Sequence, residues 1–155
     1  MSRKGDWMKL CNFKLDGKVR CGVLTDRGVV DITALGIAGS LDEVIAGDKA
    51  ALARVEKVFS DTSLPVLDPE GLEFSNVTTP QKIVCVGLNY KKHAEETGGE
   101  PSKYIVFFSK FNDALAASGQ PVELPEWQRC YDYEAELVIV MGKPAWNVPK
   151  EEALS

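Results

Sequence analysis

The chain has 155 residues, of which 45% are hydrophobic and 26% charged, a composition typical of soluble globular proteins rather than disordered or fibrous ones. The formal net charge is −5 and no basic stripe is present, which argues against nucleic acid as a partner. No apolar run is long enough to cross a bilayer, and the N-terminus lacks the pattern of a secretory signal peptide. We therefore expect a cytoplasmic protein with no membrane partner.

The first third of the sequence predicts an antiparallel meander. Alternating apolar residues over Trp7–Leu15 and Val19–Leu24 are separated by Asp16-Gly17, a strong hairpin signal. A second turn signal, at residues 26–28, leads into a third predicted strand, Val29–Ile32. This pattern indicates three consecutive strands that pair with their neighbours in sequence.

Two helices are expected after the meander. Ser40 and Glu43 have the spacing of a capping box, and Asp48 can cap a second helix. The face of the second helix predicted to be apolar contains Leu52, Val55 and Phe59. The proline-containing stretch Asp61–Pro80 shows little periodicity, so we interpret it as a connector between two structural units.

The second unit is predicted to contain three strands. They are Lys82–Val86, the apolar segment Tyr104–Phe108, and Tyr133–Met141, which has the strongest strand pattern of the chain. A short polar helix is expected over Lys91–Thr97, and another helix is expected to begin at Pro149–Leu154.

The cysteines and tryptophans are predicted to be structural. The cysteines show no Cys-x-x-Cys pair and no zinc-ligand spacing, and each lies in or beside an apolar segment, as buried free thiols would: Cys11, Cys21, Cys85 and Cys130. The tryptophans share no common spacing and are expected to pack against other side chains: Trp7, Trp127 and Trp146.

Glu134 and Glu136 form the most informative pair of polar residues. In a strand, side chains two positions apart lie on the same face, so the two carboxylates would lie together on one face of the strand. Buried together they would need a cation, and hard oxygen ligands favour Mg²⁺, Mn²⁺ or Ca²⁺. The alternative is a solvated strand face on which the glutamates meet neighbouring lysines.

His93 is the only histidine and lies three residues before Glu96 on the predicted polar helix. Side chains at this spacing are neighbours, and a carboxylate beside an imidazole suits an acid–base pair. The alternative is a surface histidine on a solvated helix. Lys110, at the end of an apolar strand, can hold a substrate carboxylate or can simply be solvated.

These motifs, taken in order, resemble the fumarylacetoacetate hydrolase family. Residues 82–96 contain Gly-Leu-Asn-Tyr-x-x-His-x-x-Glu and resemble the opening of the family's catalytic domain. Residues 107–110 resemble its next segment, and residues 132–143 resemble its metal-binding strand. The resemblance is dense from residue 82 to residue 154 and looser before it.

The resemblance implies an α+β protein: a small N-terminal meander-plus-helix domain with its connector over residues 1–79, then the first part of a mixed β-sheet catalytic domain over residues 80–155. It implies Mg²⁺ or Mn²⁺ held by Glu134 and Glu136, a catalytic dyad of His93 and Glu96, and Lys110 as a substrate contact. It also implies a homodimer. The expected substrate is a small 2-oxo or 1,3-dicarbonyl carboxylic acid, and the expected chemistry is C–C hydrolysis or a related lyase, decarboxylase or enol–keto isomerase reaction.

The third metal ligand of the simpler family site is an aspartate downstream of the glutamate strand, and no aspartate follows Glu136 here. We therefore expect the chain to be an N-terminal portion that is inactive alone, with a strongest strand that lacks partners and favours aggregation or assembly. Two alternatives remain: a non-catalytic binding or interaction module, and a metal-independent binder of small molecules.

Overall fold

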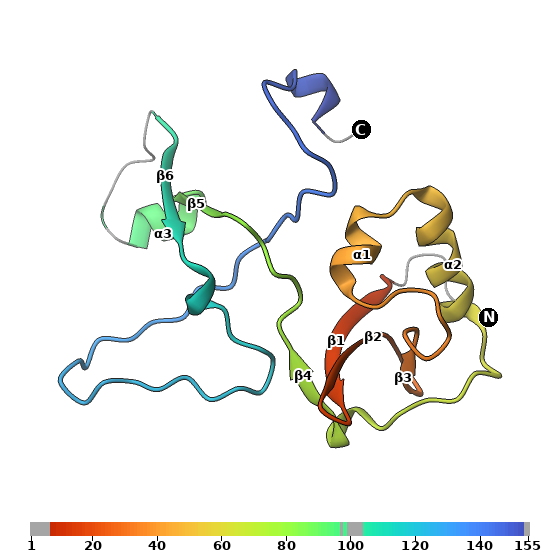
Figure 1. The fold of residues 1–155 in the computed structure, drawn as a ribbon. Helices are drawn as coiled ribbons and strands as arrows, with labels where there is room; N and C mark the ends of the chain where they lie inside the picture. The colour runs from red at the N-terminus through yellow and green to blue at the C-terminus, as the bar shows by residue number, and fades with distance from the viewer. Residues whose placement is uncertain (1–6, 97, 99–103, 154–155) are drawn as a thin grey trace.

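The structure is a computed structural model and describes residues 7–96, 98 and 104–153. It contains a four-stranded antiparallel sheet with the order β3-β2-β1-β4, two helices that cover this sheet, and a two-stranded antiparallel sheet formed by β5 and β6 (Figure 1). The predicted α+β class is thereby confirmed. Both sheets of the described residues are antiparallel.

The meander forms as the sequence predicts. Strands β1 (Lys9–Leu15), β2 (Lys18–Thr25) and β3 (Gly28–Asp31) pair in chain order. The β1–β2 turn places Asp16 at φ 50° and Gly17 at φ 70°. Positive φ at both central residues is the geometry of a type I′ turn, whose twist matches that of the flanking strands.

Both predicted helix caps are present. The Ser40 hydroxyl accepts the N–H of Glu43 at 3.3 Å and begins α1 (Leu41–Ala46), while the Glu43 carboxylate accepts the N–H of Gly39 at 2.7 Å. The Asp48 carboxylate accepts the N–H of Ala51 at 2.9 Å and begins α2 (Lys49–Ser60). These contacts satisfy backbone donors that have no partner inside the helix.

One face of α2 packs onto the sheet, but it is not quite the predicted face. Val55 and Val58 are buried, whereas Leu52 is exposed and Phe59 is partly buried. Val58 therefore takes the place of Leu52 on the packed face, while Phe59 still lies against the core. The core between helices and sheet consists of Cys21, Val23, Val30, Ile32, Leu41, Val44, Val55 and Val58.

The segment predicted as a connector is partly structured. A 3₁₀ turn, η1 (Pro69–Gly71), leads into β4 (Glu73–Ser75), which pairs with β1 at the edge of the sheet. Leu67 also exchanges two backbone hydrogen bonds with Val29, at 2.9 and 2.8 Å. β4 is too short to show a recognisable periodicity in the sequence. Its pairing also depends on a sheet edge that exists only in the folded protein.

Asn12 is the buried polar residue at the centre of this unit. Its side-chain amide donates to the carbonyl oxygens of Asn76 at 2.9 Å and Val77 at 3.1 Å, and its carbonyl oxygen accepts the N–H of Leu41 at 3.2 Å. Asn12 therefore joins β1 to the start of α1 and to the chain that leaves the sheet. Asp42 adds hydrogen bonds from Thr78 and Thr79 to this junction.

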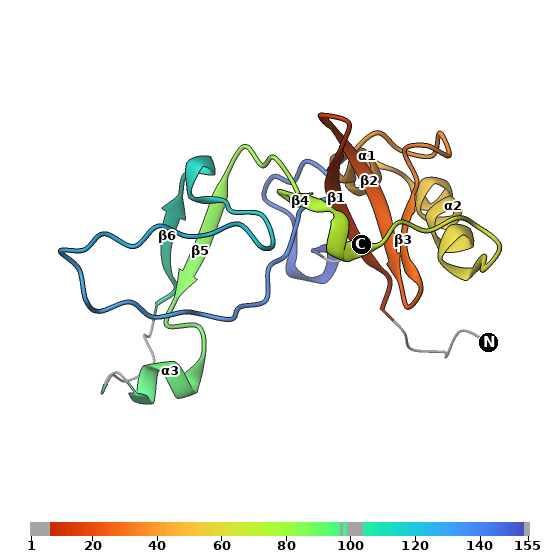
Figure 2. The ribbon, with the colours of Figure 1, turned by 90° about the horizontal axis from the view of Figure 1, so that it is seen from below.

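The second unit contains β5 (Ile83–Gly87), α3 (Lys91–Glu96) and β6 (Val106–Lys110). β5 and β6 pair from Ile83–Lys110 to Gly87–Val106, so α3 follows one end of the pair and η2 (Asn112–Ala114) follows the other (Figure 2). Beyond η2 the chain runs back toward the N-terminal unit and ends in the 3₁₀ turn η3 (Lys150–Glu152) (Figure 1).

The prediction of a strand over Tyr133–Met141 is wrong for this chain, because the described residues of that segment form no strand. A strand requires a neighbour for its backbone N–H and C=O groups, and among the described residues β5 and β6 pair only with each other. The helix expected at Pro149–Leu154 is likewise a single 3₁₀ turn within its described residues.

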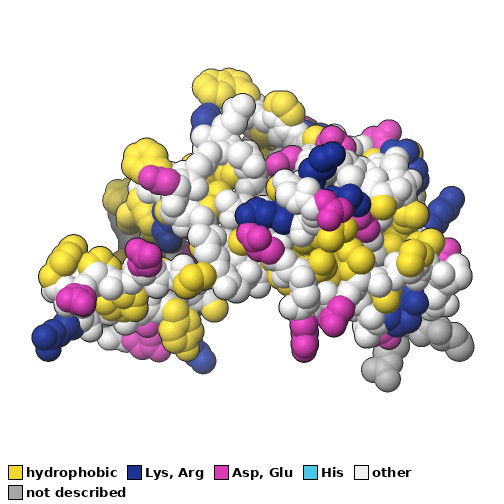
Figure 3. All heavy atoms as spheres, turned by 60° about the horizontal axis from the view of Figure 1, so that its bottom comes forward, with side chains coloured by type: hydrophobic (Ala, Val, Ile, Leu, Met, Phe, Trp, Pro, Cys, Tyr) yellow, Lys and Arg dark blue, Asp and Glu magenta, His cyan; other side chains and the backbone are white. Residues whose placement is uncertain are grey.

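Many apolar side chains of the second unit are exposed, as the space-filling view shows (Figure 3). They include Phe107 and Phe108 of β6 and the segment from Leu137 to Met141. The prediction that the tryptophans pack is also wrong, since all of them are largely exposed: Trp7, Trp127 and Trp146. Of the cysteines, Cys21 is buried but Cys130 is exposed. No helix in the described residues is long and apolar enough to span a membrane.

Gly22 gives a test of the packing on the sheet face opposite the helices. A Cβ atom at Gly22 would lie 2.5 Å from Val29 Cγ1 and 3.0 Å from Phe13 Cε1, whereas a Cβ at Gly71 would meet nothing within 4 Å. Gly22→Ala should therefore lower the free energy of unfolding by about 1–3 kcal/mol through overpacking, measured by urea denaturation. Gly71→Ala is the control and should stay near wild type; equal stability of the two variants would contradict this packing.

Asn12→Ala tests the junction. The substitution leaves the Leu41 N–H and the carbonyl oxygens of Asn76 and Val77 without their partner, so the free energy of unfolding should fall by roughly 2–4 kcal/mol in urea denaturation. Asn112→Ala, which removes one exposed hydrogen bond to the Pro80 carbonyl oxygen, is the matched control and should cost less than about 1 kcal/mol. Wild-type stability of Asn12→Ala would show that the junction carries no energy.

Candidate active site

α3 carries the histidine of the candidate site. The helix is only six residues long and is fixed by Ala94, which is fully buried, and by the hydrogen bond from the Ala94 N–H to the Tyr90 carbonyl oxygen at 3.1 Å. This anchoring leaves the His93 side chain 42% exposed. His93 is thus held on a short helix but open to a small molecule from solvent.

The structure brings His93 to Glu134, from a distant part of the chain. His93 Nε2 lies 3.6 Å from Glu134 Oε1, a contact that is an ion pair when the imidazole is protonated. Close by, the Leu137 N–H donates to the Tyr90 hydroxyl oxygen at 3.1 Å. Two motifs that the sequence analysis singled out separately therefore meet at α3.

The segment that carries Glu134 and Glu136, here called the glutamate segment, also passes close to the C-terminal end of α1. A Cβ atom on Gly142 would lie 3.1 Å from the carbonyl oxygen of Ile45, so the backbone passes close to the end of α1 there. Glycine permits this approach because it has no side chain. The segment from Glu134 to Gly142 therefore runs from α3 of the second unit to α1 of the first.

Of the other predicted site residues, Glu96 lies near His93 on the helix and Lys110 lies apart from it. Glu96 is exposed and lies three residues after His93 on α3, which are neighbouring positions on a helix. Lys110 is the last residue of β6 and pairs with Ile83. In the hairpin formed by β5 and β6, the end that leads to α3 is instead the Gly87–Val106 pair. At about 3.4 Å per residue, Lys110 lies roughly 14 Å along the strand from Val106. The structure does not bring Lys110 to the α3 end of the hairpin.

Glu134 and Glu136 fit a divalent cation in their chemistry. Carboxylate oxygens suit Mg²⁺ or Mn²⁺, and a Mg²⁺ ion is commonly held by one or two carboxylates while water and substrate complete its coordination. Within the described ranges, no three or more His, Cys, Asp or Glu side chains gather to form a protein cage. The described part of the chain therefore offers a partial donor set of the right type.

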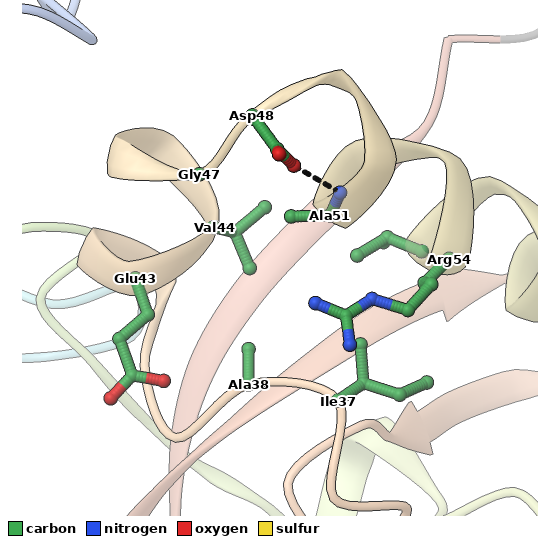
Figure 4. A pocket seen from close by; sticks show the side chains of 9 residues that line it. Ile37, Ala38, Glu43, Val44, Gly47, Asp48, Ala51 and Arg54 are labelled. Atoms are coloured by element: carbon green, nitrogen blue, oxygen red, sulfur yellow. Dashed lines mark hydrogen bonds between the residues drawn. The ribbon is translucent and has the colours of Figure 1, made fainter.

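Two other features are set apart from this site. Burial raises the pKa of the Cys21 thiol to about 12, so it stays protonated and is a poor nucleophile at neutral pH. A cavity of about 260 Å³ lies between α1, α2 and the loop before α1, with the Arg54 side chain reaching across it toward Ile37 and Ala38 (Figure 4). None of the predicted site residues lines this cavity.

Comparison with known proteins identifies the family. Residues 82–155 match the family model described as fumarylacetoacetate (FAA) hydrolase C-terminal. A maleylpyruvate hydrolase from Aquipseudomonas alcaligenes is 34% identical over 167 residues, covering 95% of this chain and 57% of that protein. A mitochondrial oxaloacetate tautomerase from Xenopus laevis is 32% identical over 106 residues, covering 68% of this chain and 31% of that protein.

Residues 82–155 belong to the fumarylacetoacetate hydrolase family, and the resemblance seen in the sequence is confirmed. Its named relatives are a hydrolase and a tautomerase, so the family contains enzymes of more than one reaction class. The chain spans between about a third and somewhat over half of the length of these two relatives. A solved fumarylacetoacetate hydrolase from Exiguobacterium antarcticum shares 26% identity and a TM-score of 0.49, covering 70% of this chain and 37% of that one.

Sequence reasoning missed Tyr90 and the direct contact between His93 and Glu134. The resemblance placed His93 and Glu134 in one site but paired His93 with Glu96 alone. Tyr90 stood in the motif without a role. The available signal was its position directly before α3, because a residue there can reach both the helix and whatever lies against it.

The contact between His93 and Glu134 can be tested by NMR, because His93 is the only histidine and its ring signals are unambiguous. Glu134→Gln removes the charge 3.6 Å from Nε2 and should shift the His93 ring resonances at neutral pH. Glu123→Gln, at an exposed glutamate in the long loop between η2 and η3, is the control and should leave the His93 resonances unchanged. Identical spectra for wild type and Glu134→Gln would rule the contact out.

Proposed function

We propose that the protein is a divalent-metal-dependent enzyme that acts on a small 2-oxo or 1,3-dicarbonyl carboxylic acid. The observation that carries this proposal is the 3.6 Å contact between His93 and Glu134, which joins the two family motifs in one place. The relatives named as a maleylpyruvate hydrolase and an oxaloacetate tautomerase support the substrate class, because maleylpyruvate and oxaloacetate are both 2-oxo carboxylic acids.

In this proposal Glu134 and Glu136 hold Mg²⁺ or Mn²⁺. When bound, the cation supplies electrostatic stabilisation of the negative charge that develops on the substrate's carbonyl oxygen. The carboxylates themselves provide the charge that keeps the cation at the site. Glu134 has a second task, since its distance from His93 lets it orient the imidazole.

His93 and Glu96 move the proton. An imidazole open to solvent on one side can take a proton from water or from the carbon beside a carbonyl group, and can return it to the product. Glu134, 3.6 Å from Nε2, holds the imidazole in one orientation for these transfers. The same pair serves C–C hydrolysis, where water must be activated, and enol–keto isomerisation, where a proton moves between carbon and oxygen.

The remaining parts of the proposal rest on the resemblance alone. We propose Lys110 as a contact for the substrate carboxylate, although the fold places it at the far end of the hairpin from α3. We further propose a cytoplasmic homodimer, and a boundary between residues 79 and 80 where the N-terminal domain and its connector give way to the catalytic domain.

A non-catalytic binding or interaction module is the second candidate function. It is favoured by the exposure of the apolar side chains from Leu137 to Met141, which present a surface that another polypeptide could cover. This candidate requires no metal at Glu134 and Glu136.

Two substitutions in the complete gene product separate metal binding from proton transfer. His93→Ala should lower turnover of oxaloacetate or acylpyruvates with Mg²⁺ by roughly 10²- to 10⁴-fold, while Mg²⁺ still binds in calorimetry. Glu134→Ala should abolish Mg²⁺ binding and turnover together. Glu123→Ala is the matched control and should change neither quantity.

The outcomes are distinct. Unchanged Mg²⁺ affinity in Glu134→Ala would show that the metal assignment is wrong, and wild-type turnover in His93→Ala would remove the dyad. If the wild-type protein turns over neither oxaloacetate nor acylpyruvates with Mg²⁺ or Mn²⁺, the enzyme proposal fails and the binding module is supported.

A further inference from the structure

Tyr90 contacts both halves of the candidate site. Its backbone carbonyl oxygen accepts the Ala94 N–H at 3.1 Å and so closes the first turn of α3. Its hydroxyl oxygen accepts the Leu137 N–H, also at 3.1 Å. One residue thus holds the helix that carries His93 and the segment that carries Glu134 and Glu136.

The hydrogen bond to Leu137 matters because the glutamate segment has no strand partner among the described residues. Leu137 directly follows Glu136, and each residue of chain spans at most about 3.3–3.6 Å. Fixing the Leu137 N–H therefore limits how far Glu134 and Glu136 can move from α3. Without such a restraint, the 3.6 Å contact of Glu134 with His93 would depend on two partly exposed side chains alone.

The backbone before Tyr90 is itself unusual. Leu88 lies at φ 52°, in the left-handed region that a leucine rarely adopts. Such a conformation persists where the surroundings impose it, and it occurs here in the turn between the end of β5 and Tyr90. This turn sets the direction in which the chain leaves β5 and so the position of Tyr90.

We infer that Tyr90 is a positioning residue of the site: its hydroxyl oxygen fixes the register of the glutamate segment against α3 and so keeps Glu134 beside His93. The consequence for catalysis rests on the proposed function, whereas the positioning itself does not.

Tyr90→Phe tests this inference, since it removes the hydroxyl group and keeps the ring. In the 155-residue chain, hydrogen exchange of the Leu137 amide should accelerate about tenfold, the effect of losing one hydrogen bond. The His93 ring resonances should shift in the direction seen for Glu134→Gln. Glu-Leu pairs occur only at 123–124 and 136–137, so labelling carbonyl carbons of Glu and nitrogens of Leu isolates Leu137 and gives Leu124 as an internal reference.

Tyr131→Phe is the matched control. The Tyr131 hydroxyl donates to the Pro125 carbonyl oxygen at 2.8 Å in an exposed hydrogen bond within the same long loop. Its loss should leave the Leu137 exchange rate and the His93 signals unchanged. In a Glu134→Gln background, Tyr90→Phe should cause no further shift of the His93 signals, because the carboxylate that Tyr90 positions is already gone.

Wild-type Leu137 exchange and wild-type His93 signals in Tyr90→Phe would overturn the inference. A merely structural role would speed exchange throughout the second unit without reproducing the Glu134→Gln shift, and that result would overturn it as well. If the predicted signals appear but the complete wild-type gene product has no activity with Mg²⁺ or Mn²⁺, the positioning stands and the proposed function fails.

Discussion

The arrangement of the N-terminal unit and of the chain that leaves it depends on one buried side chain, that of Asn12. Its amide and carbonyl groups are both used, toward Asn76 and Val77 on one side and toward Leu41 on the other. A buried amide with unsatisfied groups is costly, so this junction forms only when β1, the start of α1 and the exit segment are all in place. The point where the second unit begins is thereby fixed to the core of the first.

The candidate site obeys a different constraint. Local interactions hold α3 and its histidine, but the glutamates arrive on a segment whose apolar residues are exposed and whose backbone forms no strand in the described residues. A carboxylate pair placed in this way is positioned by few contacts, of which the Tyr90 hydrogen bond is one. This explains how two motifs can meet at α3 while a metal cage is not assembled by the described residues.

Several parts of the structure could be predicted because their causes are local. Asp16-Gly17 turns the hairpin, and Ser40 and Asp48 cap the helices, since each needs only its near neighbours in the chain. Pairing of β4 and the burial of Val58 rather than Leu52 could not be predicted, because they depend on where a sheet edge and a helix face come to lie. The strand pattern of Tyr133–Met141 misled for the same reason: an apolar run specifies a strand only when a neighbouring strand accepts its hydrogen bonds.

By itself, the sequence determined the family, the α+β class, the meander with its turn and caps, and the residue types of the site. Each of these is encoded in short motifs whose physical cause lies within a few residues. Only the tertiary structure decided that Asn12 forms the junction and that His93 meets Glu134. It also decided that Lys110 lies at the end of the β5–β6 pair away from α3, and that Tyr90 joins α3 to Leu137. Such contacts between distant residues follow from the path of the folded chain, which no local pattern contains.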